Sequence, residues 1–237
     1  MTTSKHTEES TADPHRFTVF AQDGAAKKVG LVDGARSTIP ADNIFSAPYT
    51  TAEASTIDDL HRIVAALKPG SVIVAGVHAA TPRGTTRRQK EKFAFPEGPG
   101  LLIVDSDKLG DGATIDSVRA SLGLADVECV ASPSASSGLS GGTDPDSGLR
   151  GLHLFYLIQN GVDVPEALYR LHVRAINAGH GWSRLYETGK VAARSPVDMA
   201  LKASNQACYE GGAICHEGVT QARAVEVRHG QIGRAHV

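Results

Sequence analysis

Hydrophobic and polar residues along the chain form short apolar runs separated by turn-forming residues. Short runs rich in β-branched residues and bounded by glycine, proline or polar clusters are typical of strands. The predicted strands cover residues 16–21, 28–32, 71–77, 101–107, 127–132 and 152–158. The first two flank a turn at Gln22–Gly24. The segments 33–55 and 83–92 show no regular period, so both are expected to be irregular.

Three further segments place apolar residues three and four positions apart, which is the spacing of an amphipathic helix. They cover residues 57–67, 115–122 and 164–178. Thr56 and Thr114 precede the first two segments and are expected to be N-caps, because a hydroxyl can accept a hydrogen bond from the first turn. Asp163 and Glu166 have the spacing of a capping box for the third. Strands and helices in this order predict an α+β fold with helices packed against a sheet.

The periodic segments divide into an N-terminal part, residues 16–70, and a core, residues 71–225. Residues 1–15 are polar and lack periodicity, so they are expected to be disordered. Residues 232–237 match the translation of a common sequencing-library adapter. This match predicts an artefact there and a natural chain that continues beyond about Gln231, so the tail is excluded from the fold prediction.

Composition and charge limit the partners and the cellular compartment that we expect for this protein. The formal net charge of −2 over 237 residues gives no overall attraction to nucleic acid, so any such binding must come from local patches. Three cysteines are too few for a disulfide framework and fit the reducing cytoplasm. The chain has no apolar run of membrane-spanning length and no export signal at its N-terminus, so a cytoplasmic protein without a membrane partner is expected.

A pair of acids carries the first candidate chemistry. Asp105 and Asp107 directly follow the apolar run Leu101–Val104. Because side chains alternate along a strand, the two carboxylates share a face, roughly 6–7 Å apart. Their repulsion would be relieved by a hard divalent cation, Mg²⁺ or Mn²⁺. The alternative interpretation is a strand that simply ends in a polar turn.

Two later residues strengthen the interpretation as a metal site. His153 lies at the start of a predicted strand behind a Ser/Gly-rich loop, and Asp198 comes shortly after a basic residue, Arg194, further along the chain. Three carboxylates can hold two divalent ions, and a histidine can donate to phosphate oxygens. This set is what phosphoryl or nucleotidyl transfer requires.

The segment 83–92 is the one strongly basic stretch, and it directly precedes the acidic strand. Its candidate phosphate-binding side chains are Arg83, Arg87, Arg88 and Lys90. A basic loop beside a carboxylate pair is well placed to hold nucleic-acid phosphates. A solvated surface is the alternative.

These residues resemble motifs of the archaeo-eukaryotic primase superfamily, in particular the primase-polymerase domains of phages, plasmids and other mobile elements. The three motifs correspond to Val104–Asp107, Gly151–His153 and Val197–Asp198. The turn at Ser136–Gly138 and the stretch Tyr209–Gly212 are also similar to family sequence. The resemblance covers about residues 75–220. Each motif alone is weak, and the three in this order are fairly specific.

The resemblance implies an RNA-recognition-motif-like sheet, antiparallel or mixed, that forms the catalytic core of a template-dependent nucleotidyltransferase, a DNA primase/polymerase. It implies that Asp105, Asp107 and Asp198 bind Mg²⁺ or Mn²⁺ and that His153 contacts the triphosphate of the incoming nucleotide. The implied partners are template and primer DNA, ribo- or deoxynucleoside triphosphates, and a fused or separate helicase.

Gly151 departs from the family pattern, which more commonly has serine at this position. Ser136 or Ser137 is therefore expected to supply a hydroxyl to the nucleotide. Arg194 and Lys190 lie just ahead of Asp198 and are expected to contact the triphosphate or the template.

Other functions fit parts of the pattern. A non-catalytic replication-initiator or DNA-binding module on the same scaffold would use the basic segment without metal. A glycosyltransferase could hold a sugar nucleotide with Asp105 and Asp107, but it leaves His153 and Asp198 without a role.

Two smaller features have interpretations of their own. A zinc site at Cys208, Cys215 and His216 offers only three ligands at an unusual spacing, so it is disfavoured. Trp182 lies in a glycine-flanked turn, where packing is preferred over stacking on a base.

Overall fold

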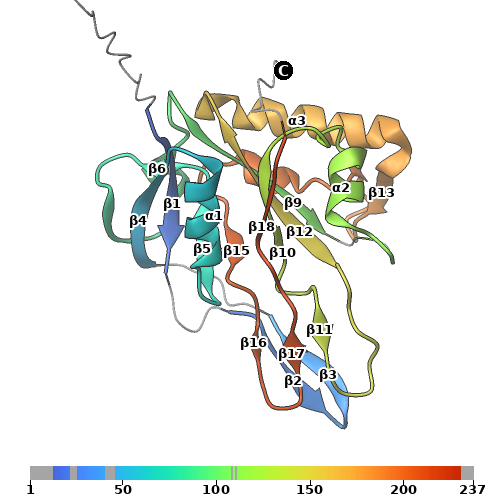
Figure 1. The fold of residues 1–237 in the computed structure, drawn as a ribbon. Coiled ribbons are helices and arrows are strands. Elements are labelled where there is room, and N and C mark those ends of the chain that lie inside the picture. Colours follow the sequence, from blue (N-terminus) through green and yellow to red (C-terminus); the bar gives the residue numbers. More distant parts are fainter. Residues whose placement is uncertain (1–12, 22–25, 41–45, 108, 110, 231–237) are drawn as a thin grey trace, which may run out of the picture.

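The computed structural model describes residues 13–21, 26–40, 46–107, 109 and 111–230 (Figure 1). The predicted disorder of residues 1–15 and the adapter-like tail therefore lie almost wholly outside the described residues. The fold is α+β, with one large mixed sheet and few helices. The strands of this sheet run in the order β15-β5-β1-β9-β12-β10-β18, and β4 and β7 extend it from β1.

The strands of the large sheet are β1 (His15–Phe20), β4 (Ala47–Ala54), β5 (Ser71–Val74), β7 (Arg83–Thr86), β9 (Gly100–Asp107), β10 (Cys129–Pro133), β12 (Gly151–Ile158), β15 (Cys208–Glu210) and β18 (Glu226–Arg228). The strands of the smaller sheets are β2 (Lys28–Val32), β3 (Ala35–Ile39), β6 (Val77–His78), β8 (Phe93–Ala94), β11 (Leu139–Ser140), β13 (Trp182–Leu185), β14 (Val191–Arg194), β16 (Ile214–Cys215) and β17 (Thr220–Gln221). The helices are α1 (Ile57–Ala65), α2 (Ile115–Ser121) and α3 (Val164–Ala175). Shorter helical turns are η1 (Lys90–Lys92), η2 (Gly161–Asp163), η3 (Ile176–His180) and η4 (Met199–Lys202).

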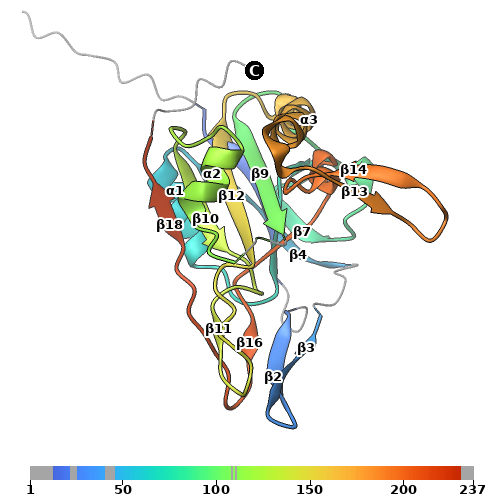
Figure 2. The ribbon, with the colours of Figure 1, turned by 90° about the vertical axis from the view of Figure 1, so that its right-hand side faces the viewer.

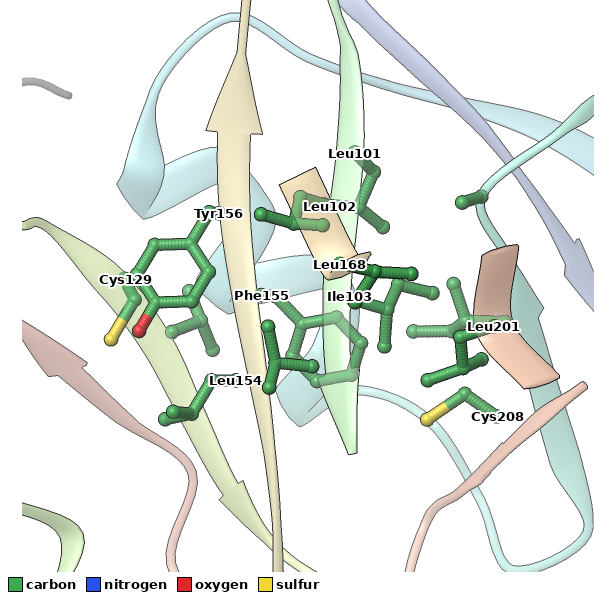
Figure 3. Packing of buried hydrophobic residues seen from close by; sticks show 14 of the residues in the cluster. Leu101, Leu102, Ile103, Cys129, Leu154, Phe155, Tyr156, Leu168, Leu201 and Cys208 are labelled. Atoms are coloured by element: carbon green, nitrogen blue, oxygen red, sulfur yellow. The ribbon is translucent and has the colours of Figure 1, made fainter. Parts of the chain in front are cut away.

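Strands β9 and β12 form the centre of the large sheet. They pair antiparallel over eight residues each, from Gly151 opposite Asp107 to Ile158 opposite Gly100. Both strands read as continuous apolar runs because both of their faces are covered. Their fully buried residues join the main core, together with side chains from α3 and η4 such as Leu168 and Leu201 (Figure 3).

The predicted N-caps of the first two helices are confirmed. Thr56 and Thr114 each accept a hydrogen bond at 3.1 Å from the backbone N–H three residues on, and a capping box forms at both helices. The capping box predicted for α3 is wrong, because Asp163 makes no side-chain capping bond and the short turn η2 leads into the helix instead. Pro165 fits this start, since the first turn of a helix does not need its N–H.

Several strand predictions need correction. The strand at 16–21 does not form a hairpin with the strand at 28–32, because β1 pairs with β4, β5 and β9 whereas β2 pairs with β3. The segment 33–55, expected to be irregular, contains β3 and β4. The basic segment 83–92, expected to be a loop, forms β7 and η1. These strands are short, polar or half-exposed, so their apolar pattern is weak and pairing partners decide their structure.

Two small additions project from the main body. The sheet β16-β2-β3 and the pair β11–β17 extend away from one end of β9 and β12 (Figures 1 and 2). The hairpin β13–β14 extends on another side, beyond the C-terminal end of α3 (Figure 2). None of the helices within the described residues has the length and apolar character needed to cross a membrane.

Candidate active site

The register of the two central strands places Asp105 and His153 opposite each other. Directly opposed residues of an antiparallel pair point to the same face. The His153 Nε2 lies 3.6 Å from the Asp105 Oδ1. Asp107, two residues further along β9, shares this face by the alternation of the strand, and it stands opposite Gly151. The predicted acid pair and the predicted histidine therefore meet at one place.

Asp198 arrives at the other edge of β9. Val197 forms an isolated antiparallel bridge with Ser106, and the Asp198 N–H donates to the Asp105 carbonyl at 2.9 Å. In this register Asp198 is directly opposite Asp105 and points to the same face. Its side chain also caps η4, where its Oδ1 accepts from the Ala200 N–H at 3.0 Å. The three acids thus lie side by side although more than 90 residues separate the first from the last.

Burial and the neighbouring acids shift the pKa of Asp105. Burial raises its pKa from an ordinary value of 3.8 to about 6, and the charges of Asp107, Asp198 and Glu210 act in the same direction, whereas His153 opposes them. Its Oδ1 is buried and accepts no hydrogen bond from the described residues. A buried carboxylate oxygen without a donor is costly, and a bound cation would remove that cost.

The ring nitrogen of His153 that faces away from Asp105 contacts Glu210, an acid that was not among the predicted site residues. The His153 Nδ1 and the Glu210 Oε1 are 2.6 Å apart, and the Glu210 side chain is completely buried. The Glu210 Oε2 accepts from the Ser132 hydroxyl at 3.0 Å and from the Arg223 guanidinium. Arg223 also donates to the Pro133 carbonyl at 2.8 Å. His153 is therefore part of a buried network of contacts that links Arg223 to Glu210, Glu210 to His153, and His153 to Asp105.

The charge of His153 follows from these neighbours. Burial alone lowers its pKa, but the negative groups around it outweigh burial and raise the pKa of His153 well above 6.5. Burial also raises the pKa of the Cys208 thiol to about 11, so at neutral pH this sulfur is uncharged. The carboxylates of Asp105 and Glu210 therefore supply the negative charge that favours an imidazolium.

His153, Cys208 and Glu210 form a compact group of metal-ligating side chains. Their ligand atoms all lie within 4.8 Å of one another, and all three residues are buried, so this group could hold a metal ion. The zinc set considered from the sequence is a different one. In the described part of the chain Cys215 and His216 do not join this group, because β16 pairs with β2 in the projecting sheet.

The serines near Gly151 have roles that the sequence did not reveal. A side chain at Gly151 would place its Cβ 2.6 Å from the Ser134 Oγ and 2.9 Å from the Asp107 Oδ1. The Ser134 hydroxyl therefore occupies the space that a serine at position 151 would need. The Ser137 hydroxyl donates to the Gly151 carbonyl at 2.8 Å and accepts from the N–H groups of Arg150 and Gly151, so it holds backbone and is 1% exposed.

A lysine joins the site from the N-terminal part of the chain. The Lys27 ammonium donates to the Ser136 hydroxyl at 2.8 Å. Burial lowers the pKa of Lys27, and the charge of Asp107 acts to raise it. No sequence signal pointed to Lys27. Ser136 lies next to this cation.

The basic segment takes a position different from the expected one. β7 pairs with β4, which β1 separates from β9 in the sheet. Arg83, Arg87 and Lys90 are exposed there. The Arg88 guanidinium is half-buried and donates to the Asn205 carbonyl at 2.8 Å, which gives it a structural role. Residues of this segment line a separate hollow of about 450 Å³ with Tyr49 and His78.

Arg194 and Lys190 lie on the hairpin β13–β14, with Lys190 exposed in its turn. Arg194 donates to the hydroxyl of Tyr186, which directly follows β13. Trp182 is 44% exposed, so more than half of its surface is covered by the protein and the rest is open to solvent. These residues lie on a hairpin that leads, four residues after Arg194, to Asp198.

The group of residues assembled here combines four carboxylates, an imidazole, an ammonium and a guanidinium, drawn from β9, β12, β15 and three connecting segments. The sequence predicted Asp105, Asp107, Asp198 and His153. The structure adds Glu210, Arg223, Cys208, Ser132, Ser134 and Lys27 to the group. Comparisons of the chain with protein-family models, with curated proteins and with solved structures find no match.

Proposed function

We propose that this chain is a template-dependent nucleotidyltransferase of the primase-polymerase type, which acts in the replication of a phage, a plasmid or another mobile element. The observation that carries the proposal is the meeting of Asp105, Asp107 and Asp198 on one face of the sheet, with His153 opposite Asp105. We infer that the large sheet is the RNA-recognition-motif-like core of such an enzyme.

The donor set fits divalent cations. Carboxylate oxygens are the ligands that Mg²⁺ and Mn²⁺ prefer, and the buried Asp105 Oδ1 accepts no hydrogen bond from the described residues, with the His153 Nε2 at 3.6 Å as its charged neighbour. Asp105, Asp107 and Asp198 would hold the ions. When bound, such ions supply Lewis-acid activation of the primer hydroxyl and neutralise charge on the triphosphate.

The remaining side chains have roles in binding and orientation. In the reaction, the primer 3′-oxygen bonds to the α-phosphorus of the nucleotide, the hydroxyl proton passes to a base, and the bond to pyrophosphate breaks. Lys27, whose pKa feels the charge of Asp107, donates to the Ser136 hydroxyl and could donate to phosphate oxygens together with it. The carboxylates around His153 raise its pKa, so we assign it a positive charge beside Asp105 that favours binding of the polyanionic nucleotide.

A template-extension assay tests the proposal. A primed DNA template is incubated with Mg²⁺ or Mn²⁺ and with ribo- or deoxynucleoside triphosphates in parallel. Asp105→Ala together with Asp107→Ala should abolish extension while circular dichroism shows an intact fold. Asp126→Ala, which removes an exposed acid in a loop before β10, is the matched control and should keep full activity. Extension by the double variant at the wild-type rate would overturn the proposal.

The same assay addresses the main alternative. A non-catalytic replication-initiator or DNA-binding module would bind the template in the presence of EDTA and transfer no nucleotide under any condition. Binding without extension by the wild-type chain, with both metals and both kinds of nucleotide present, would favour that alternative.

A further inference from the structure

The hairpin β13–β14 has a side-chain arrangement that the proposed transfer reaction does not itself require. It forms a separate two-stranded sheet, with Trp182 opposite Arg194 and Leu185 opposite Val191. An isolated two-stranded ribbon buries little surface and is marginally stable without a partner. It extends from the body at the end of α3 (Figure 2).

The register sorts the side chains of the hairpin into two faces of different chemistry. Opposed residues share a face, and faces alternate along each strand. One face is aromatic and basic and carries Trp182, Arg184, Tyr186, Lys190 and Arg194. The other is small or aliphatic and carries Ser183, Leu185, Val191 and Ala193. We call these the aromatic face and the aliphatic face.

The groups of the aromatic face are ordered by one another. The Arg184 guanidinium lies 4.9 Å from the centre of the Tyr186 ring, and that of Arg194 lies 5.7 Å from the same centre. Arg194 also donates to the Tyr186 hydroxyl. Tyr186 therefore holds both guanidinium groups in place, which reduces the entropy that binding a ligand would cost. Trp182 presents a large ring at the base of the same face, 44% exposed.

We propose that the aromatic face of β13–β14 binds single-stranded nucleic acid. An exposed indole offers a surface on which a base can stack, and arginines and a lysine beside it can pair with phosphates. Arg184, Lys190 and Arg194 oppose a single acid of the hairpin, Glu187, so the patch is positive although the chain as a whole is slightly negative. This charge favours a polyanion and disfavours a basic or purely apolar partner.

The position of the hairpin suggests which strand it holds. This step rests on the proposed function. β14 ends at Arg194, and four residues later the chain reaches Asp198 beside Asp105. Four extended residues span at most about 14 Å, so a strand on the aromatic face would lie within a few nucleotides of the acids. We therefore assign the aromatic face to the unpaired template.

The single tryptophan of the chain makes the binding proposal directly measurable. Because Trp182 is the only tryptophan, its fluorescence reports on this face alone. A mixed-sequence 20-nucleotide single-stranded DNA is titrated into the full chain in EDTA at low salt, with tryptophan emission and the anisotropy of a label on the DNA followed together. We expect the Trp182 emission to fall over the same DNA concentrations at which the anisotropy of the label rises. Binding that leaves the Trp182 emission unchanged, or no binding at all, would overturn the proposal.

Variants of the two faces provide the matched comparison. Trp182→Ala and Arg184→Ala should each weaken binding roughly 5- to 100-fold, and Trp182→Phe should retain most of the affinity because it keeps a stacking ring. Arg184→Ala should also reduce the dependence of the dissociation constant on salt, as expected for a lost phosphate contact. The aliphatic-face control, Leu185→Ser with Val191→Ser, should change affinity less than twofold. Equal losses of DNA affinity from the two faces would overturn the assignment of binding to the aromatic face.

Failure here is separable from failure of the proposed function. Binding is measured without metal or nucleotide, so it does not depend on transfer. The Asp105→Ala/Asp107→Ala variant should still quench Trp182 on adding DNA. A chain that extends primers without Trp182 quenching would keep the proposed function and lose this inference, and quenching without extension would do the reverse.

Discussion

The His153 Nδ1 and the Glu210 Oε1 lie 2.6 Å apart in a fully buried contact between β12 and β15. A carboxylate on one ring nitrogen fixes the orientation of an imidazole and directs the other nitrogen, here toward Asp105. Glu210 is itself held by Arg223 and Ser132. The orientation of the histidine at the front of the site therefore depends on residues behind it.

Loss of the Glu210 charge should destabilise the protein. Glu210→Gln keeps the shape but leaves the Arg223 guanidinium, whose side chain is 13% exposed, without its counter-ion. Removing one partner of a buried pair costs about 3–5 kcal/mol, whereas replacing both partners by apolar groups can be nearly neutral. Urea unfolding should show a large loss for Glu210→Gln and a smaller one when Arg223→Met is added. A double variant less stable than Glu210→Gln would contradict this coupling.

The raised pKa of Asp105 predicts how stability changes with pH when no metal is bound. The folded chain holds the proton of this carboxyl up to a pH of about 6, whereas the unfolded chain releases it near 3.8. Because the folded state binds this proton more tightly, its contribution to stability falls as pH rises from about 4 to above 6. Asp105→Asn should remove this loss. The free energy of unfolding of Asp105→Asn, relative to that of wild type, should therefore increase by up to about 3 kcal/mol between pH 4 and a pH above 6.

Chemical denaturation of wild type and Asp105→Asn in EDTA at several pH values between 4 and 8 measures this difference. Asp126→Asn, an exposed acid elsewhere, is the control and should track the wild type. A constant difference between Asp105→Asn and wild type at every pH would refute the assignment of the raised pKa.

Divalent cations should stabilise the wild-type chain above pH 7. A cation that binds only the folded state raises stability in proportion to the logarithm of its concentration, about 2.7 kcal/mol at one hundred times the dissociation constant. Thermal unfolding with increasing Mn²⁺ or Mg²⁺ should show a rising midpoint for wild type. The midpoint of the Asp105→Asn/Asp107→Asn variant should not move. Equal shifts in the two proteins would place the bound ion somewhere else.

Gly151→Ser, which introduces the residue more common in the primase-polymerase domains that the motifs resemble, should impair the site. Its Cβ would come within 2.9 Å of the Asp107 Oδ1 and 2.6 Å of the Ser134 Oγ, so one of these side chains must move. Overpacking of this kind costs about 1–3 kcal/mol. Adding Ser134→Gly should restore much of the extension activity and stability, because it frees the space. A Gly151→Ser chain as active and stable as wild type would show that the contact is easily relieved.

Lys27 should matter for nucleotide affinity. A hydrogen bond to a charged group contributes about 1.5–3 kcal/mol, so Lys27→Met should raise the KM for nucleotide roughly 10- to 100-fold. Lys28→Met, at the start of β2 and half-buried as well, is the neighbouring control. Steady-state extension kinetics with varied nucleotide separate KM from kcat. An unchanged KM in Lys27→Met would remove this residue from the phosphate site.

Much of the local structure was predictable from the sequence. The run before Asp105 is buried on both faces, and its pattern is that of a central strand. Thr56 and Thr114 were found because a capping hydroxyl acts on residues three positions away, which a sequence displays directly. The sharing of one face by Asp105 and Asp107 follows from strand alternation alone.

The sequence by itself determined the central strands, two helix caps and the acids and histidine worth considering, because period and capping are local properties of the chain. Only the tertiary structure decided which residues meet. Asp198 reaches Asp105 through a single bridge, Lys27 and Arg223 come from distant segments, and Glu210 reaches His153 from another strand of the sheet. Such contacts depend on strand order and register between segments that are far apart, and no local pattern of residues encodes that order.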